Sequence, residues 1–169
     1  MNRTLLPLAA ALVTFACGDS QPTSPDGSAD AAARLSRSES RSGSGCRDVQ
    51  GTIVEYITGP NTAAGKITGD VSGDVSIVIT ALRQMEGGVV QFDAHCTMVT
   101  ADGTFNATDQ ATLTPIEAPL YRVNNRLAVS GGTGEYSGVT GKLHTHGTAN
   151  FVPGGLVDLR YRGQLCKTQ

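Results

Sequence analysis

The sequence predicts an all-β domain of eight antiparallel strands that begins near Arg47. Short runs of alternating apolar and polar residues recur along this part of the chain, and Gly, Pro, Asn or Asp follow most of them. The chain has 21 glycines, no Trp and only 5% aromatic residues, a composition typical of turn-rich β structure and not of a helical bundle. Strands spaced in this way form a sandwich or a barrel, not parallel βαβ units.

The first four expected strands are each defined by their alternation and by the turn that follows. Gly, Pro, Ser and Asp favour tight turns, so consecutive strands are expected to form hairpins. The strands are 48–58, 65–70, 74–83 and 89–100, and the turns lie at Gly59-Pro60, Ser72-Gly73, Gly87-Gly88 and Asp102-Gly103.

The last four expected strands follow in the same way. A segment from Pro115 to Pro119 holds two prolines, which a central strand does not accommodate, so it is predicted to be a turn. A glycine-rich segment and then Pro153-Gly154-Gly155 supply the remaining turns. The strands are 104–114, 121–129, 142–151 and 156–165.

Alternation also assigns side chains to the two faces of each strand, because successive residues point to opposite sides. Glu55 shares a face with Ile53 and Ile57, so it is either buried with partners or part of an outward apolar stripe. Asp109 shares a face with Phe105 and Leu113, which gives a second carboxylate among apolar neighbours. The other positions expected to face the core are Val90, Phe92, Ala94, Cys96, Met98, Leu143, Thr145, Ala149, Phe151, Val157, Leu159, Tyr161 and Leu165.

The glycine-rich segment from Ser130 to Gly141 joins two of these strands. Its five glycines predict positive φ angles or close backbone contacts, and Tyr136 is an apolar side chain over which the segment can fold. A nucleotide-binding loop is the rival interpretation. That loop needs Lys and then Ser or Thr after its last glycine, followed by a helix, whereas Lys142 to His146 alternates like a strand. The segment is therefore expected to be architectural.

The text from Asn125 to Gly141 resembles the corresponding segment of the allene oxide cyclases. In that family a Leu-Ala-Val-Thr-Gly-Gly-Ser-Gly-like run is followed by an aromatic residue, a Gly and a closing Gly. The plant dirigent proteins carry a similar block. The resemblance implies a closed, eight-stranded, antiparallel up-and-down β-barrel whose lumen holds a small apolar molecule. A shared fold does not by itself imply catalysis.

The resemblance also points to Glu55. In the allene oxide cyclases a glutamate on the first strand acts on the substrate epoxide at the barrel mouth, and burial would raise the pKa of such a group. Ile57 stands where that family has a water-holding asparagine, and Ala64 stands near the place of a proline, so the cyclase site is not reproduced. A structural glutamate with a Thr, Arg or water partner is the alternative. The residues expected to line the lumen with Glu55 are Phe92, Cys96, Asp109, Tyr121 and Tyr161.

His144 and His146 project from the same face of one predicted strand, a spacing that metal sites use. Their face also carries Lys142 and Asn150, and no third ligand stands in a matching position. The pair is therefore expected on the solvated exterior, with no metal. The sequence holds no Ser-His-Asp pattern, no Gly-x-Ser-x-Gly motif and no Cys-x-x-Cys pair, and no cofactor is expected.

The N-terminal residues predict export from the cytoplasm. Arg3 precedes an apolar stretch that is too short to span a bilayer, and Ala16-Cys17-Gly18 follows it. Residues 1–16 are predicted to be a bacterial lipoprotein signal with Cys17 acylated; an ordinary secretory signal is the alternative. Residues 17–45 are predicted to be a disordered tether, and residues 46–169 the barrel domain. The expected location is the bacterial periplasm or cell surface, anchored to the membrane through Cys17.

The remaining cysteines number three, so one is expected to be unpaired in an oxidising compartment. In an up-and-down barrel with an even number of strands, the first and last strands are antiparallel neighbours. Cys46 then lies beside Cys166, which favours a disulfide between them and leaves Cys96 as a buried thiol.

Two classes of function stay open from the sequence. A net charge of -2 and a pI near 5.9 offer no basic face for nucleic acid. The first class is a carrier or surface binding module that uses the lumen for its shape. The second is a cofactor-free cyclase or isomerase, or a dirigent-type guide of a coupling reaction, that uses Glu55. The departures from the cyclase site favour the first class, and a homo-oligomer is left open.

Overall fold

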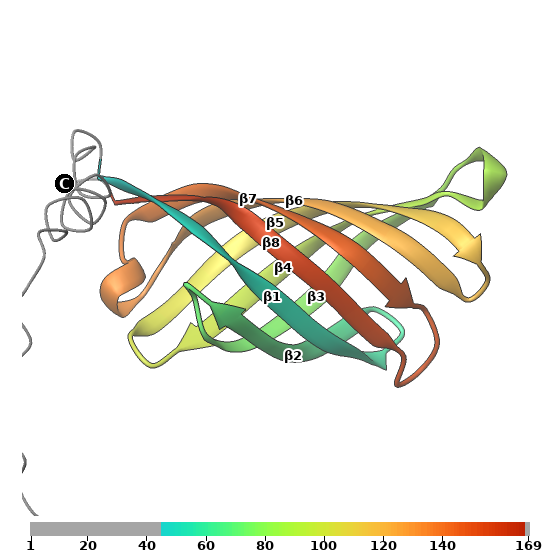
Figure 1. Cartoon of the computed structure of the whole chain (residues 1–169), viewed down its shortest axis with the longest axis horizontal. Coiled ribbons are helices and arrows are strands. Elements are labelled where there is room, and N and C mark those ends of the chain that lie inside the picture. The colour runs from blue at the N-terminus through green and yellow to red at the C-terminus, as the bar shows by residue number, and fades with distance from the viewer. Residues whose placement is uncertain (1–44, 168–169) are drawn as a thin grey trace, which may run out of the picture. The chain divides into compact units, whose positions relative to one another are not determined.

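The chain forms a closed barrel of eight antiparallel strands, seen from the side in Figure 1. The computed structural model describes residues 45–167, so the predicted signal, Cys17 and the tether up to residue 44 lie outside the described residues. Each strand pairs with its neighbours in sequence, and β1 pairs with β8 to close the sheet. The predicted eight-stranded barrel is confirmed. The strands are β1 (Cys46–Gly59), β2 (Thr62–Gly69), β3 (Gly73–Gln84), β4 (Val90–Thr100), β5 (Gly103–Glu117), β6 (Leu120–Gly132), β7 (Val139–Asn150) and β8 (Leu156–Lys167).

Several strand ends differ from the sequence-based expectation by one to three residues. Strand β6 ends at Gly132 and strand β7 begins at Val139, so both strands extend three residues into the segment expected to connect them. Strand β2 begins at Thr62, three residues early, because the β1–β2 turn is confined to Pro60 and Asn61. Strand β5 runs through Pro115 to Glu117, where a shift in register marks a bulge. A bulge accommodates a proline, which has no N–H to donate to the neighbouring strand. Among the described residues, no helix has the length and apolar character needed to cross a bilayer.

Side chains alternate between the lumen and the outer wall, as the sequence predicts. Glu55 and Asp109 face the lumen, each 1% exposed, whereas His144 and His146 are exposed on the outer wall. The lumen is filled by one continuous apolar core, which supplies most of the stability of a domain of this size. Its largest fully buried apolar members are Phe105, Ile67, Met98, Leu113 and Leu143.

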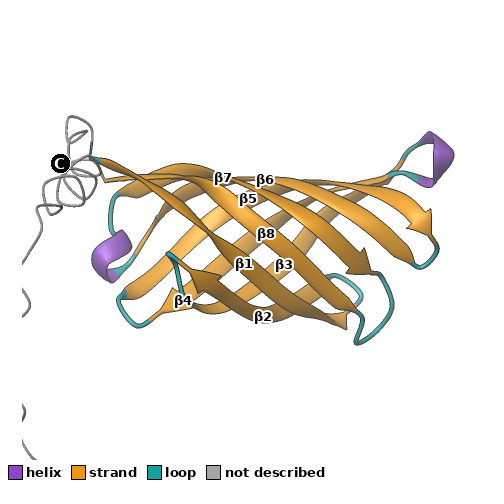
Figure 2. Cartoon of the chain, in the orientation of Figure 1, coloured by secondary structure: helices purple, strands orange, loops and turns teal. Residues whose placement is uncertain are grey.

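One end of the barrel is closed by side chains, and we call it the plugged end. The connection between β6 and β7 contains a 3₁₀ turn, Gly134–Tyr136, which Figure 2 shows at the opposite end from the turn Glu86–Gly88. Tyr136 is buried, and its ring centroid lies 4.8 Å from that of Phe105. The β2–β3 turn also covers this end, because the Tyr161 hydroxyl accepts a hydrogen bond from the Val71 N–H at 3.0 Å.

The glycine-rich segment is architectural, as predicted, and its backbone donors are already used within the fold. The Glu135 N–H donates to the Asp102 carbonyl at 2.9 Å, and the Thr133 N–H donates to the Thr104 carbonyl at 2.8 Å. The Ser137 N–H donates back to Gly134 at 3.2 Å. A phosphate cradle needs such N–H groups to be free to point at the ligand. The loop therefore ties the plugged end to the β4–β5 turn.

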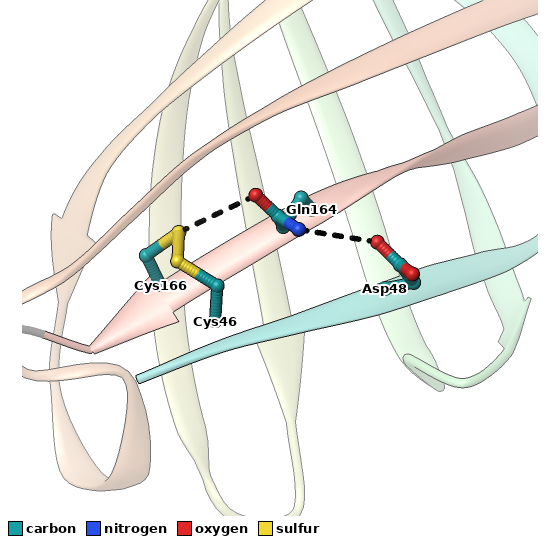
Figure 3. The surroundings of a disulfide bond; sticks show 4 residues. All are labelled: Cys46, Asp48, Gln164 and Cys166. Carbon is teal, nitrogen blue, oxygen red and sulfur yellow. Dashed lines mark hydrogen bonds between the residues drawn. A yellow bond between two sulfur atoms is a disulfide. The ribbon is translucent and has the colours of Figure 1, made fainter. Parts of the chain in front are cut away.

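A disulfide between Cys46 and Cys166 fixes the seam of the barrel, as shown in Figure 3. The two cysteines face each other at the first register pair of β1 and β8. Next to the bridge, the Gln164 side-chain amide donates to Asp48 Oδ1 at 3.2 Å across the same two strands. Cys96 is free and buried. The predicted pairing is confirmed, and within residues 45–167 Cys96 is the free thiol, as predicted.

The glycine loop generates a stability prediction. Gly134 has a φ of +59°, and a Cβ added there would lie 2.2 Å from the Asp102 carbonyl oxygen. Gly87 has a similar φ of +70° but no atom within 4 Å of such a Cβ. Both alanine variants incur strain from the positive φ, about 1 kcal/mol, whereas only Gly134→Ala also incurs a clash with backbone.

Gly134→Ala should therefore destabilise the barrel by roughly 2 to 4 kcal/mol, and Gly87→Ala by about 1 kcal/mol. Urea unfolding of the two variants beside the wild type measures the difference. Equal losses in the two variants would show that close packing of the loop on Asp102 is unimportant.

Candidate functional site

The end of the barrel opposite the plug is open, and we call it the mouth. It is formed where β1, β3, β5 and β7 end and where β2, β4, β6 and β8 begin. A cavity of about 50 Å³ leads inward from it. Its wall is apolar except for Thr62 at the mouth and for Glu55 and Asn125 at the inner end. The apolar lining includes Ile57, Ala63, Phe92, Ala149 and Phe151.

The inner end of the cavity is lined by Glu55 and Asn125, and two further buried polar side chains, Asp109 and Thr145, adjoin Asn125 without lining the cavity. Glu55 comes from β1 and Asp109 from β5, which is the strand farthest from β1 in the closed order. Asn125 of β6 lies next to Asp109, and its side-chain amide donates to Asp109 Oδ2 at 3.0 Å. We call Glu55, Asp109, Asn125 and Thr145, all of them buried, the polar floor.

Burial changes the protonation of the two carboxyl groups. Burial and, to a smaller extent, the negative charge of Asp109 together raise the pKa of Glu55 to about 7. Burial also raises the pKa of Asp109 to about 7, although the hydrogen bond from Asn125 acts in the opposite direction. Ionisation of either group makes ionisation of the other less favourable. Because both pKa values lie near 7, the pair takes up or releases protons near neutral pH.

The polar floor holds more hydrogen-bond acceptors than donors. One oxygen of each member, namely Glu55 Oε1, Asp109 Oδ1, Asn125 Oδ1 and Thr145 Oγ1, has no hydrogen-bond partner among the described residues. A buried acceptor without a partner costs roughly 1 to 3 kcal/mol. A proton on either carboxyl group, or a donor group brought by a ligand, would reduce that cost. The floor is therefore suited to receive a hydroxyl or amine.

The structure brings together some of the residues that the sequence predicted for the lumen. Phe92 lines the cavity beside Glu55, and Asp109 belongs to the polar floor. Cys96 is buried, and burial together with the charges of Glu55 and Asp109 raises the pKa of its thiol far above the usual range. Such a thiol stays protonated and is a poor nucleophile.

Two further predicted residues lie away from the polar floor. Tyr121 is half-buried at the mouth, where its ring meets that of Phe151 edge-on at 5.8 Å. Tyr161 is buried at the plugged end, and its hydroxyl also donates to the Val71 carbonyl at 3.3 Å. Its partners are thus main-chain atoms of the β2–β3 turn, which gives Tyr161 a structural position.

Asn125 was not singled out from the sequence as a site residue. The signal was nonetheless present, because Asn125 alternates with Val123 and Leu127 and so occupies an inward position. Its partner Asp109 lies on the neighbouring strand, and the β5–β6 register that joins them depends on the bulges in β5. Alternation alone does not give that register.

The two histidines of β7 stand on the outer wall and not in the lumen. His144 lies opposite Arg162 and His146 opposite Arg160, in the register of β7 and β8. Within residues 45–167, no group of three or more His, Cys, Asp or Glu side chains is placed to hold a metal ion.

The mouth is bordered by exposed apolar side chains on three hairpins. These side chains are large, and each is at least one-third exposed. They are Leu82 and Met85 on β3–β4, Ile116 and Leu120 on β5–β6, and Val152 and Leu156 on β7–β8. Scattered exposed apolar residues are ordinary, but a concentration at one opening marks a surface that an apolar molecule can contact.

No family model matches the chain, and neither a curated protein nor a solved structure matches it significantly. The geometry of the barrel and its mouth is therefore the basis for assigning a function.

The carboxyl pair predicts an unusual pH dependence of stability. Both pKa values are raised on folding, so the folded state binds more protons than the unfolded state between about pH 4 and pH 7. This contribution is fully present below the pKa values of the unfolded chain and is lost as the pH rises through about 7. The free energy of unfolding should fall between about pH 4 and pH 8, by roughly 3 kcal/mol for each of the two groups.

Urea unfolding across this pH range measures the slope. Asp109→Asn should flatten it, because the amide removes one of the two titrating groups. Asp158→Asn, at an exposed position on β8, is the matched control and should leave the slope unchanged. A wild-type protein whose stability rises through this range would contradict the assignment of a buried carboxyl pair.

Proposed function

We propose that this barrel is a binding protein for a small, slender apolar molecule that inserts one end through the mouth. The observation that carries the proposal is the apolar cavity with a polar floor at its inner end. Eight-stranded barrels are just wide enough either to be filled by side chains or to hold one small ligand. This barrel does both, since side chains fill the plugged end and a cavity remains at the mouth.

The cavity volume restricts what such a ligand can place inside. A volume of about 50 Å³ holds only a few water-sized groups. The end of an alkyl chain or a small ring fits this space, while the rest of the molecule would lie against the exposed apolar side chains of the mouth. The polar floor would then receive a hydroxyl or amine at the inserted end, because its free oxygens are acceptors.

A second candidate function is catalysis by Glu55, in a cofactor-free cyclase or isomerase of the allene oxide cyclase or dirigent type. The observation that favours it is the pKa of Glu55, which is raised to about 7. A general acid or base is most effective when its pKa lies near the working pH. Ile57 lines the cavity where the allene oxide cyclases have an asparagine that holds water, so carriage remains the primary proposal.

We also propose that the protein is exported and held at a bacterial membrane by acylation of Cys17. The support is the N-terminal sequence, together with the Cys46–Cys166 disulfide, since such bridges persist in oxidising compartments. A carrier with this attachment would present its mouth to apolar molecules outside the cytoplasm.

The carrier proposal predicts that filling the cavity blocks binding. Ala63 lines the cavity, so Ala63→Leu should place a side chain in the ligand's path and weaken binding of the apolar dye N-phenyl-1-naphthylamine by about tenfold or more. Ala128→Leu adds the same atoms on the exposed outer wall of β6 and is the matched control. Dye fluorescence titrations measure both variants, and thermal melts check their folding. Equal binding by both variants and the wild type would place the dye outside the lumen.

The catalytic candidate predicts a loss of turnover without a loss of binding. Glu55→Gln keeps the size and hydrogen bonding of the side chain but cannot exchange a proton, so conversion of fatty-acid epoxides or polyenes should fall by about a hundredfold. Glu117→Gln, at an exposed position on β5, controls for the loss of charge. Product analysis by mass spectrometry decides the question. Wild-type protein that binds these compounds and converts none of them is a carrier.

A further inference from the structure

The outer wall of the barrel concentrates basic side chains on three neighbouring strands. The register places Arg126 of β6 opposite His144 of β7, and His144 opposite Arg162 of β8. In the next row His146 lies opposite Arg160, and Lys142 stands two residues before His144 on β7. All six side chains are exposed. The net charge of -2 does not reveal this basic wall, because it sums the charges of the whole chain.

These basic side chains are not neutralised by acids of the fold. The ion pairs of the described residues are Lys66–Asp74 and Arg83–Asp93, and neither involves β6, β7 or β8. Three acids lie on this wall: Asp93 is paired with Arg83, Asp48 accepts from Gln164, and Asp158 lies opposite Thr148. Arg126, Arg160 and Arg162 are exposed and take part in none of the ion pairs of the described residues, so they are available to an anionic partner outside the fold.

The same wall is hollowed along this row. A depression of about 820 Å³ extends from Arg83 on β3 to Arg162 on β8. It crosses the curved outer face of the barrel from β3 to β8. At the β3–β4 end it is lined by Arg83 and Asp93, which form an ion pair with each other. Between that pair and the arginines of β6 and β8 it is lined by the amide side chains of Gln91, Gln110 and Asn124. It is thus a polar groove in which Arg126 and Arg162 stand outside the ion pairs of the described residues.

We propose that this groove, defined by Gln110, Asn124, Arg126, His144 and Arg162, binds an acidic polysaccharide. Guanidinium groups bind carboxylates or sulfates in a bidentate manner, and amide side chains both donate to and accept from sugar hydroxyls. The groove crosses several strands and carries Arg126 and Arg162 on separate strands, which suits an extended chain whose charges repeat and not a single small anion.

Two other polyanions fit this face less well. Single-stranded nucleic acid is held largely by stacking on aromatic rings, and the residues lining the groove at its surface include no exposed aromatic side chain. Binding to a bilayer in the interface requires apolar side chains to insert, and the exposed apolar side chains of this barrel gather at the mouth and not on this wall.

The proposal is tested with polygalacturonate as a carboxylated glycan, dextran as its neutral counterpart, single-stranded DNA, and vesicles that contain anionic phospholipid. Wild-type protein should bind polygalacturonate, with an affinity that falls as salt rises, and should not bind dextran. Arg126→Gln combined with Arg162→Gln should weaken the binding about tenfold or more. Lys66→Gln combined with Lys167→Gln removes the same charge from other exposed positions and should change binding by less than about twofold.

Glu55→Gln serves as a further control, because the groove is separate from the lumen and its binding should be unaffected. Thermal melts establish that each variant is folded. Three results would overturn the proposal: no binding of polygalacturonate at low salt, an equal loss in the two double variants, or tighter binding of DNA or vesicles than of the glycan. None of these results bears on binding at the mouth.

Discussion

The pairing of β1 with β8 is the constraint on which the rest of the structure depends. It joins the two ends of the sheet through eleven consecutive register pairs, from Cys46 with Cys166 to Tyr56 with Leu156. An open sheet would present two unpaired edges and would turn one face of every strand to water. Closure converts that face into a lumen, and it sets Glu55 across from Asp109 in a space where water is scarce. The raised pKa values of both groups are consequences of closure, since neither sequence neighbourhood would produce them on an exposed strand.

The polar floor is the part of the fold that works against stability. An apolar residue at Glu55 or Asp109 would fill the same space without a buried charge, and one amide from Asn125 compensates only part of the cost. The other buried side chains of the lumen are apolar, so buried polar groups are confined to the few side chains of the polar floor. Local violations of this kind concentrate at functional sites. The position of the polar floor beneath the mouth is the strongest reason to regard the mouth as the candidate functional site.

Much of the fold could be predicted from the sequence, because alternation and turn residues are local signals. They located all eight strands and put Glu55 and Asp109 on faces with apolar neighbours. The barrel topology, which the family resemblance implied, then turned those faces to the lumen and paired Cys46 with Cys166. The contents of the site could not be obtained in this way. The hydrogen bond from Asn125 to Asp109 and the row formed by Arg126, His144 and Arg162 both depend on inter-strand register, which bulges and turn lengths set. The small cavity depends on how side chains from all eight strands fill the lumen, and no single segment encodes that.

The seam disulfide has a topological consequence. With a bond between residues 120 positions apart, the chain from Cys46 to Cys166 is a covalent ring in which every strand has two neighbours and no strand is terminal. A single proteolytic cut in an exposed hairpin, such as the one at Gly87-Gly88, would open this ring but leave one molecule, its fragments still joined through sulfur and through the sheet. In any compartment where proteases are common, such a ring can be cut once in a hairpin while the fragments stay covalently joined.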